Sequence, residues 1–287
     1  MMLSLIVIAC SQPEQKIDTS TEKPPINTCD EGFSYTYVMN NISYARREDN
    51  VAWGLNVDNH VSDENDEEGC YKEDLVDPLG NKGVDNALSA LLPALDMTEA
   101  AAVEGLMIDS INNGELLLML KLTGIDSEMQ GESLQDDCTT LEFLHGEGSP
   151  LVGTDGAIID GQSFSRDPYP SVFQSTAIDD GAFLATGMEL HLEMQVLDKY
   201  LIFDMDNGGI YGQMQADGTL TGYFGGGLDL ETLYGIAGFD EVQITDLLNN
   251  LLSTAADLAP DENGECQQMS VAFEYTAIPA HIFLDEQ

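Results

Sequence analysis

The sequence contains very little positive charge. Only nine of its 287 residues are Lys or Arg, against 52 Asp and Glu, and the formal net charge is −43. Nucleic-acid binding depends on clustered Lys and Arg that displace counterions from phosphates, so this function class is excluded. Docking onto anionic lipid is unfavourable for the same reason. Such a surface attracts divalent cations or basic partners, and it also keeps a protein soluble in a salty medium.

Long hydrophobic runs and signature catalytic motifs are absent as well. No segment reaches the roughly 18 to 20 apolar residues that a transmembrane helix needs. The four histidines form no HExxH motif, and residues 161–165 (GQSFS) end in Ser where a GxSxG nucleophile elbow requires Gly. A polysaccharide hydrolase needs only two carboxylates about 5 to 9.5 Å apart. With 52 acidic residues available, this activity stays an open alternative.

The chain begins with a short apolar segment that ends at a cysteine. Its last four residues, Val7-Ile8-Ala9-Cys10, resemble the lipobox of bacterial lipoproteins. The resemblance implies a signal peptide over residues 1–9 and a mature chain that begins at lipid-modified Cys10. Acyl chains give a stable membrane anchor because each buried methylene contributes about 0.8 kcal/mol. Since Ser11 is compatible with onward transfer, we predict an exported protein anchored to the cell envelope at the outer membrane.

Four further cysteines remain once Cys10 is assigned to the anchor: Cys29, Cys70, Cys138 and Cys266. An even number in an exported chain predicts two disulfides, with three connectivities open. No CxxC spacing occurs, which argues against a zinc site. Residues 10–28 are polar and contain Pro, Ser and Thr, so they are predicted to form a flexible tether. Residues 29–287 are predicted to form a single globular, β-rich domain.

The pattern of apolar residues predicts several strands and a few helices in this domain. Alternation predicts strands over residues 33–39 and 188–196, the continuous apolar run at 116–122 predicts a buried strand, and further strands are predicted over 51–57 and 269–278. Helical spacing predicts a helical hairpin, with Thr98 as an N-cap and a stop at residues 113–114, and a later amphipathic helix; these span residues 84–113 and 240–258. The expected fold is mainly β with helices (α+β). Its antiparallel sheet would be sandwich-like or a half-barrel, and would carry the hairpin and the further helix.

Glycine-rich segments are interpreted as turns between the later strands. Residues 206–209 (DNGG) and 217–218 (DG) have the composition of hairpin turns. Residues 225–227 (GGG) precede Asp229, in a setting that sometimes binds phosphate at a helix N-terminus. No Lys or Arg lies nearby and an acidic residue occupies the capping position, so a turn is predicted there too.

Two segments carry a resemblance to a family of bacterial proteins. Residues 54–59 (GLNVDN) and 83–93 (GVDNALSALLP), with a cysteine between them and a glycine-rich β region after them, resemble uncharacterised acidic lipoproteins of predatory or social bacteria. The resemblance covers about residues 30 to 280. It implies a place in the cell envelope and supplies no catalytic residues.

Oxygen-bearing side chains gather between residues 58 and 86. Calcium takes about six to eight oxygen ligands, and this region offers suitable ones. The candidates are Asp58, Asp63, Asp66, Asp77, Asn81 and Asp85. Residues 77–86 partly resemble calcium loops built on alternating Asp and Gly, but lack the Glu that completes an EF-hand. The alternative is that Asp85 and Asn86 lie at a helix N-terminus, where acidic groups complement the helix dipole.

A second candidate site is the stripe formed by Glu189, His191 and Glu193. On a strand these side chains share one face, with neighbours about 6.5 to 7 Å apart. A neighbouring strand could then complete a metal site. The alternative, which the alternation favours, is an ordinary solvated face of a sheet.

These observations favour a protein that binds rather than catalyses. The membrane, through the lipid anchor, and a cationic or envelope component are the expected partners, with calcium as a candidate structural ligand. Two alternatives stay open: a secreted polysaccharide hydrolase that uses paired carboxylates, and a carrier that holds lipid on the apolar face of its sheet. A cleft with facing carboxylates would favour the hydrolase, a large apolar pocket the carrier, and clustered Asp at one loop a binding protein.

Overall fold

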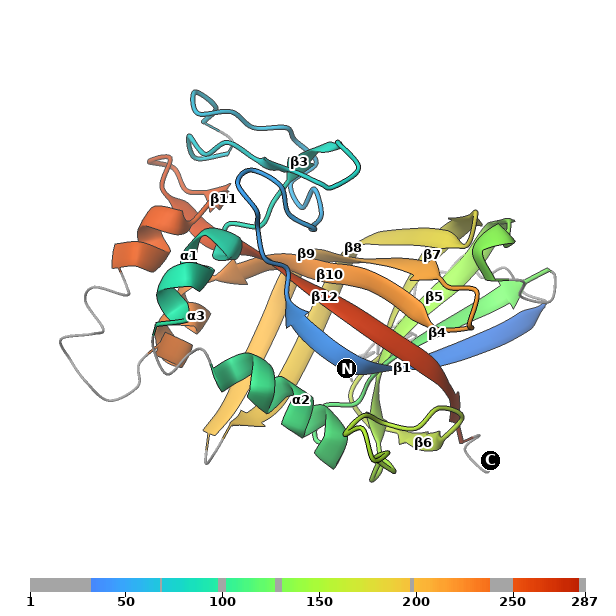
Figure 1. The fold of residues 1–287 in the computed structure, drawn as a ribbon. Helices are drawn as coiled ribbons and strands as arrows, with labels where there is room; N and C mark the ends of the chain where they lie inside the picture. The colour runs from blue at the N-terminus through green and yellow to red at the C-terminus, as the bar shows by residue number, and fades with distance from the viewer. Residues whose placement is uncertain are drawn as a thin grey trace, which may run out of the picture.

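A closed antiparallel barrel of eight strands forms the centre of the computed structural model, which describes residues 32–67, 69–97, 102–126, 131–196, 199–237 and 250–283 (Figure 1). The strands are β1 (Phe33–Tyr44), β4 (Leu118–Ile125), β5 (Asp136–Glu147), β7 (Val172–Asp179), β8 (Ala182–Val196), β9 (Lys199–Met214), β10 (Leu220–Asp229) and β12 (Cys266–Ile282). Each pairs with the next in this order, and β12 returns to pair with β1.

The sandwich-like or half-barrel sheet predicted from the sequence is therefore wrong. Alternation along a strand separates a buried face from an exposed face, but it does not say whether the sheet closes. Closure depends on the pairing of the first strand with the last, which places Thr36 opposite Ala280 and Tyr44 opposite Phe273. A register shift between Met39 and Asn41 bends β1. The bent strand pairs with β4 through its first half and with β12 through most of its length.

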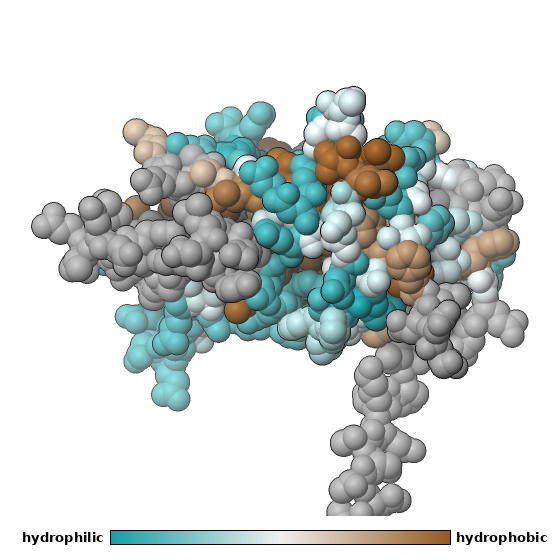
Figure 2. Space-filling model, turned by 90° about the horizontal axis from the view of Figure 1, so that it is seen from below, coloured by the Kyte–Doolittle hydropathy of each residue, from teal (hydrophilic) through white to brown (hydrophobic). Residues whose placement is uncertain are grey.

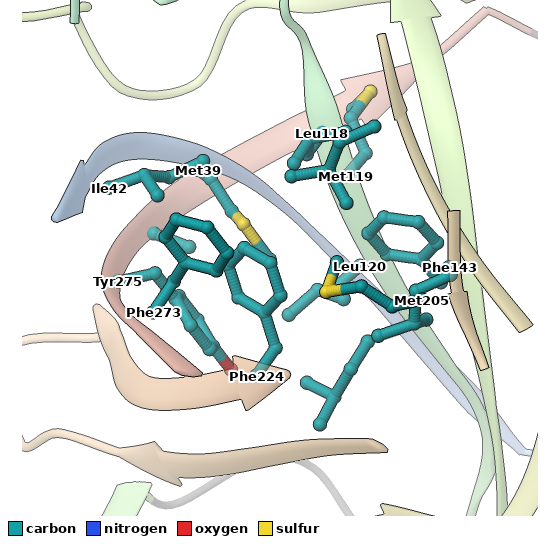
Figure 3. Close-up of a cluster of buried hydrophobic side chains, with 14 of the residues drawn as sticks. Met39, Ile42, Leu118, Met119, Leu120, Phe143, Met205, Phe224, Phe273 and Tyr275 are labelled. Atoms are coloured by element: carbon teal, nitrogen blue, oxygen red, sulfur yellow. The ribbon is translucent and has the colours of Figure 1, made fainter. Parts of the chain in front are cut away.

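Side chains fill the interior of the barrel. Met39, Leu120, Phe143, Met205 and Phe224 come from different strands, are at most 1% exposed and point toward one another (Figure 3). An eight-stranded barrel is only wide enough for side chains or one small ligand. Since large side chains occupy this space, the described residues lend no support to the lipid-carrier alternative.

Four of the five predicted strands agree with the structure. β1, β4, β8 and β12 each contain or overlap a predicted segment. Within β8, Met188, Leu190 and Leu192 are buried while Glu189 and Glu193 are exposed, as the alternation indicated. Residues 51–57, by contrast, form only isolated bridges, so the strand predicted there is wrong.

The glycine-rich segments behave differently from one another. Residues 217–218 do form the turn between β9 and β10. Residues 206–209 lie inside β9, where Asn207 has a φ of +48° and the pairing with β8 and β10 shifts. Residues 225–227 lie inside β10. Two of the three predicted turns are therefore wrong, because pairing with neighbouring strands places these small residues inside long strands.

The remaining elements lie in the connections between the barrel strands. They are β2 (Leu75–Val76), β3 (Lys82–Val84), α1 (Leu88–Leu95), α2 (Val103–Asn113), the 3₁₀ turn η2 (Gly131–Ser133), β6 (Ser163–Arg166), α3 (Leu230–Ala237) and β11 (Leu258–Pro260). Figure 1 shows α1, α3 and β11 at one end of the barrel and α2 beside β1. Among the described residues, no helix has the length and apolar character needed to cross a bilayer.

The helical hairpin predicted over residues 84–113 corresponds to α1 and α2. The second helix buries Met107 and Ile111 and ends at Gly114, whose φ of +83° is the left-handed conformation typical of a helix stop. Thr98, predicted as its N-cap, lies outside the described residues. Of the later helix predicted over residues 240–258, the described part is helical through residue 255, and Leu258 begins β11.

Glycine allows close approach between β9 and β10. A Cβ at Gly222 would lie 2.0 Å from the carbonyl oxygen of Tyr211, so Gly222→Ala is expected to lower the free energy of unfolding by about 2 to 4 kcal/mol. The control is Gly105→Ala in α2, where nothing lies within 4 Å and a gain of roughly 0.5 to 1 kcal/mol is expected. Urea unfolding measures both; equal midpoints would contradict the close packing of these strands.

Candidate functional site

The connection between β1 and α1 forms an acidic cover over the outside of the barrel. This cover, residues 45–86, attaches through Trp53, whose ring stacks on that of Tyr223 of β10 with centroids 5.4 Å apart. A small buried cluster joins Leu55 of the cover to Leu258 of β11. In Figure 1 the cover, with β3, lies above the barrel, on the side away from α2 and β6.

A disulfide ties this cover to the barrel. Cys70 is bonded to Cys266, the first residue of β12, which confirms one of the predicted disulfides. Cys138 of β5 is also disulfide-bonded. Its partner is either Cys10 or Cys29, and both lie outside the described residues. The sequence left three connectivities open, and among these only the one that pairs Cys29 with Cys138 contains the Cys70–Cys266 bond.

Three of the six predicted calcium ligands, Asp58, Asp63 and Asp77, bind the backbone of their own loop. Asp77 accepts hydrogen bonds from the amide of Leu79 at 2.9 Å and from both the amide and the side chain of Asn81. Asp63 accepts from the amide of Asn65 at 2.7 Å, a contact that stabilises the turn.

The other candidate ligands are similarly engaged. Asp58 accepts a hydrogen bond from the amide of His60, and Asp66 from the His60 ring at 2.7 Å. Asp85 lies next to Asp58 and accepts from its amide at 3.4 Å. Within the described ranges, no group of three or more His, Cys, Asp or Glu side chains could hold a metal ion. The structure thus places these carboxylates in separate turns, and calcium binding stays a prediction.

Asp85, a buried carboxyl group, makes two further contacts in this region. Asp85 is 3% exposed and accepts a hydrogen bond from the amide of Val57 at 2.6 Å. Burial, followed by the charges of Asp58 and Asp257, raises the pKa of Asp85 to about 8. Asp85 is hydrogen-bonded to Asp74, whose pKa is also raised by burial. Burial therefore favours the protonated form of Asp85 at neutral pH.

Asp257 connects this cluster to the barrel. It precedes β11, is buried, and accepts hydrogen bonds from the amide and the hydroxyl of Ser270 in β12, at 2.8 and 2.5 Å. The same hydroxyl accepts from the amide of Ala87, next to α1. Burial raises the pKa of Asp257 to about 6. The sequence had indicated neither Asp74 nor Asp257, because their importance comes from contacts between distant segments.

These paired carboxyl groups do not support the hydrolase alternative. A catalytic acid has to contact its substrate, and its partner has to face it across a cleft. Asp85 is 3% exposed and already binds the amide of Val57. The cluster is therefore suited to holding the cover in place rather than to acid–base catalysis.

An open pocket of about 360 Å³ lies beside the disulfide. Its lining residues come from the cover and from the turn before β12: Glu67, Tyr71, Pro260, Asp261, Glu262, Asn263 and Gly264. Tyr71 is 53% exposed, and its hydroxyl donates to Glu67 at 3.3 Å. Backbone amides of Glu265 and Asn263 lower the pKa of Asp261, which keeps this carboxylate ionised. An aromatic face beside three carboxylates is suited to an ammonium or guanidinium group.

The stripe on β8 does not form a shared metal site. His191 contacts Asp204 of β9 through Nδ1 at 2.5 Å, while its Nε2 lies 3.9 Å from Glu193. Glu189 is hydrogen-bonded to Asp206 instead, and burial raises its pKa. Only two of the three predicted side chains therefore come near each other.

Two aromatic groups that the sequence did not indicate complete the surroundings of His191. The ring of Tyr169 stacks on the imidazole with centroids 4.1 Å apart. His145 donates from Nε2 to the carbonyl oxygen of His191 at 2.9 Å, and burial lowers its pKa, which favours the neutral ring. Both groups come from other strands or loops, and together they pack against β8 where β7 no longer pairs with it.

No family model matches the chain, and comparisons with curated proteins and with solved structures likewise yield no match. The resemblance to acidic lipoproteins stays a prediction. The two segments that carry it do meet in the structure, because Leu55 and Asp85 form a β-bridge at the inner edge of the cover.

Proposed function

We propose that this protein is an exported, lipid-anchored module of the cell envelope that binds a cationic partner at its acidic cover. The disulfide between Cys70 and Cys266 is the observation that carries the proposal, because disulfides form and persist mainly in oxidising compartments outside the cytosol. Acylation of Cys10 would hold the chain at the membrane. Ser11 is compatible with the outer membrane as the final location.

The cationic partner is supported by charge and by the pocket beside the disulfide. The net charge of −43 steers positively charged molecules toward the surface. At the pocket, the exposed ring of Tyr71 and the carboxylates around it provide a local binding geometry that the net charge alone does not. Lys or Arg side chains of a basic polypeptide, or a polyamine, have the matching chemistry.

Acylation of Cys10, as proposed, leaves one possible partner for Cys138 in a second disulfide. Cys70 and Cys266 are bonded to each other, so the partner of Cys138 is either Cys10 or Cys29. A thioether-linked lipid on Cys10 leaves Cys29. We therefore propose a Cys29–Cys138 disulfide, which would fasten the start of the folded domain to β5.

Mass spectrometry of membrane fractions is expected to find an acylated N-terminal peptide that begins at Cys10. An unreduced digest of the same material should contain one peptide pair joined through Cys29 and Cys138. In Cys10→Ala the acylated peptide should disappear and the chain should no longer be processed at this position. An unmodified Met1 terminus in the native protein would contradict the anchor, and free thiols at Cys29 and Cys138 would contradict the second disulfide.

Binding of an oligolysine peptide is expected to depend on Tyr71. Tyr71→Ala should weaken binding about 3- to 10-fold, as loss of a cation–π contact predicts, whereas Tyr71→Phe should retain most of it. Isothermal titration at low salt measures both, with Asp217→Asn on the β9–β10 turn as a control for a lost surface charge. Equal affinities for all variants would reduce the interaction to general charge attraction and reject the pocket.

A further inference from the structure

Large apolar side chains are exposed together at one end of the molecule. Leu151 is 67% exposed, Val152 41% and Ile159 46%, all within a nine-residue stretch before β6. Phe283, just after β12, is 59% exposed. Soluble proteins often expose such residues singly, but a contiguous group of them marks an interaction surface.

The residues that carry these side chains form a hairpin held together by hydrogen bonds. The amide of Ile159 donates to the carbonyl of Leu151 at 3.0 Å, and Val152 bridges to Ile158. The side chain of Gln162 bonds the backbone of both Leu151 and Ile159. We call residues 151–159 the apolar hairpin. Because backbone contacts hold it in place, its apolar side chains are displayed outward in a fixed arrangement.

The apolar hairpin lies where the described chain begins and ends. β6, which follows the hairpin, pairs in parallel with the end of β12, while the start of β1 pairs with the other edge of β12. The amide of Phe283 donates to Phe164 of β6, and Phe33 at the start of β1 is 49% exposed. Figure 1 shows β6 below the barrel, and Figure 2, seen from below, shows apolar surface among the polar residues of this face.

We propose that the apolar hairpin, with Phe283 and Phe33, rests in the headgroup region of the bilayer to which Cys10 is anchored. This inference rests on the proposed function. The chain between Cys10 and β1 is 22 residues long, and if it forms the predicted flexible tether it would span about 25 Å and hold this end of the barrel within reach of lipid. Large apolar groups partition favourably into this zone.

The negative charge of the protein predicts which lipid headgroups it contacts and how the barrel is oriented on the membrane. Asp155 on the apolar hairpin and Asp160 just after it are exposed, and the whole chain is strongly acidic, so zwitterionic rather than anionic headgroups are the expected surface. The acidic cover lies on the side of the barrel away from β6 (Figure 1). Contact through the apolar hairpin would therefore turn the cover and its pocket away from the membrane, toward a cationic partner.

Fluorescence quenching by brominated phosphatidylcholine tests this orientation on the acylated full-length protein in vesicles. The natural tryptophan, Trp53, stacks on Tyr223 in the cover and serves as an internal reference. Leu151→Trp adds a second tryptophan on the apolar hairpin, and Leu79→Trp adds one on the cover, at a position that is 74% exposed. The tryptophan added at position 151 is expected to be quenched at least about twofold more than that added at position 79.

Equal quenching at the two positions, or quenching at neither, would overturn the proposal. So would self-association of the protein through the apolar hairpin, seen as a dimer that Leu151→Ser abolishes. The acyl mass on Cys10 is read separately. If Cys10 proves unmodified, the anchor is rejected, but quenching of Leu151→Trp in the full chain mixed with the same vesicles still decides the membrane contact, and its absence would refute it.

Discussion

Replacing both Cys70 and Cys266 by serine is expected to lower the free energy of unfolding by about 2 to 5 kcal/mol. The bond joins residues 196 positions apart, so its loss frees a very long loop in the unfolded chain. For a loop of this length the chain-entropy model predicts about 5 kcal/mol, and measured values are commonly smaller. Urea unfolding of the wild type and the double variant gives the difference directly.

The same double variant is expected to loosen the cover before the barrel unfolds. Beside this bond, the cover is held by the stacking of Trp53 on Tyr223 and by the buried carboxyl groups, all of them weaker than a covalent link. Hydrogen exchange should therefore quicken at the amides of Val57 and Ser62 and change little in β10 and β12. An unchanged unfolding midpoint, or equal acceleration throughout the barrel, would contradict this view of the disulfide as a fastening of the cover.

The elements that could be predicted from the sequence are those whose signal is local. The alternation in residues 188–196 specifies a strand with one buried face, and Gly114 specifies the end of α2, because each depends on neighbouring residues alone. Closure of the barrel could not be predicted, since it depends on β1 meeting β12 across nearly the whole chain. The DNGG segment at 206–209 has the composition of a turn, yet pairing on both sides incorporates it into β9.

The candidate site likewise combines residues that the sequence indicated with residues that it could not indicate. Asp85 and five other residues of the cover were predicted to bind calcium, and the structure places their side chains in separate turns, so this stays a prediction. Backbone amides of the short loops bind carboxylates there, as in the contacts of Asp77. Asp74 was missed because its contact with Asp85 forms within the folded cover, and Asp257 was missed because its charge acts on Asp85 only where the start of β11 lies beside the cover.

Asp85→Asn is expected to stabilise the protein at alkaline pH by roughly 1 to 3 kcal/mol. The folded-state pKa of Asp85 is raised to about 8, far above that of an exposed Asp, so folding favours the protonated carboxyl. This contribution to stability is fully present below about pH 4 and is lost as the pH rises through about 8. An amide has the neutral form at every pH, keeps an acceptor for the amide of Val57 and donates to Asp74.

Thermal unfolding between pH 4 and pH 9 measures the effect. The variant and the wild type should be nearly equal at pH 4 and diverge progressively as the pH rises to about 8, with the variant more stable and the difference constant above that pH. The control is Asp217→Asn on the exposed β9–β10 turn, where hydrogen bonds from Thr219 lower the pKa of the carboxyl, so stability there is lost as the pH falls instead. If Asp85→Asn is the less stable protein at pH 9, the ionised carboxylate is the form that the fold needs. A bound cation would then be the natural partner of that carboxylate, and stabilisation of the wild type by calcium but not of the variant would identify it.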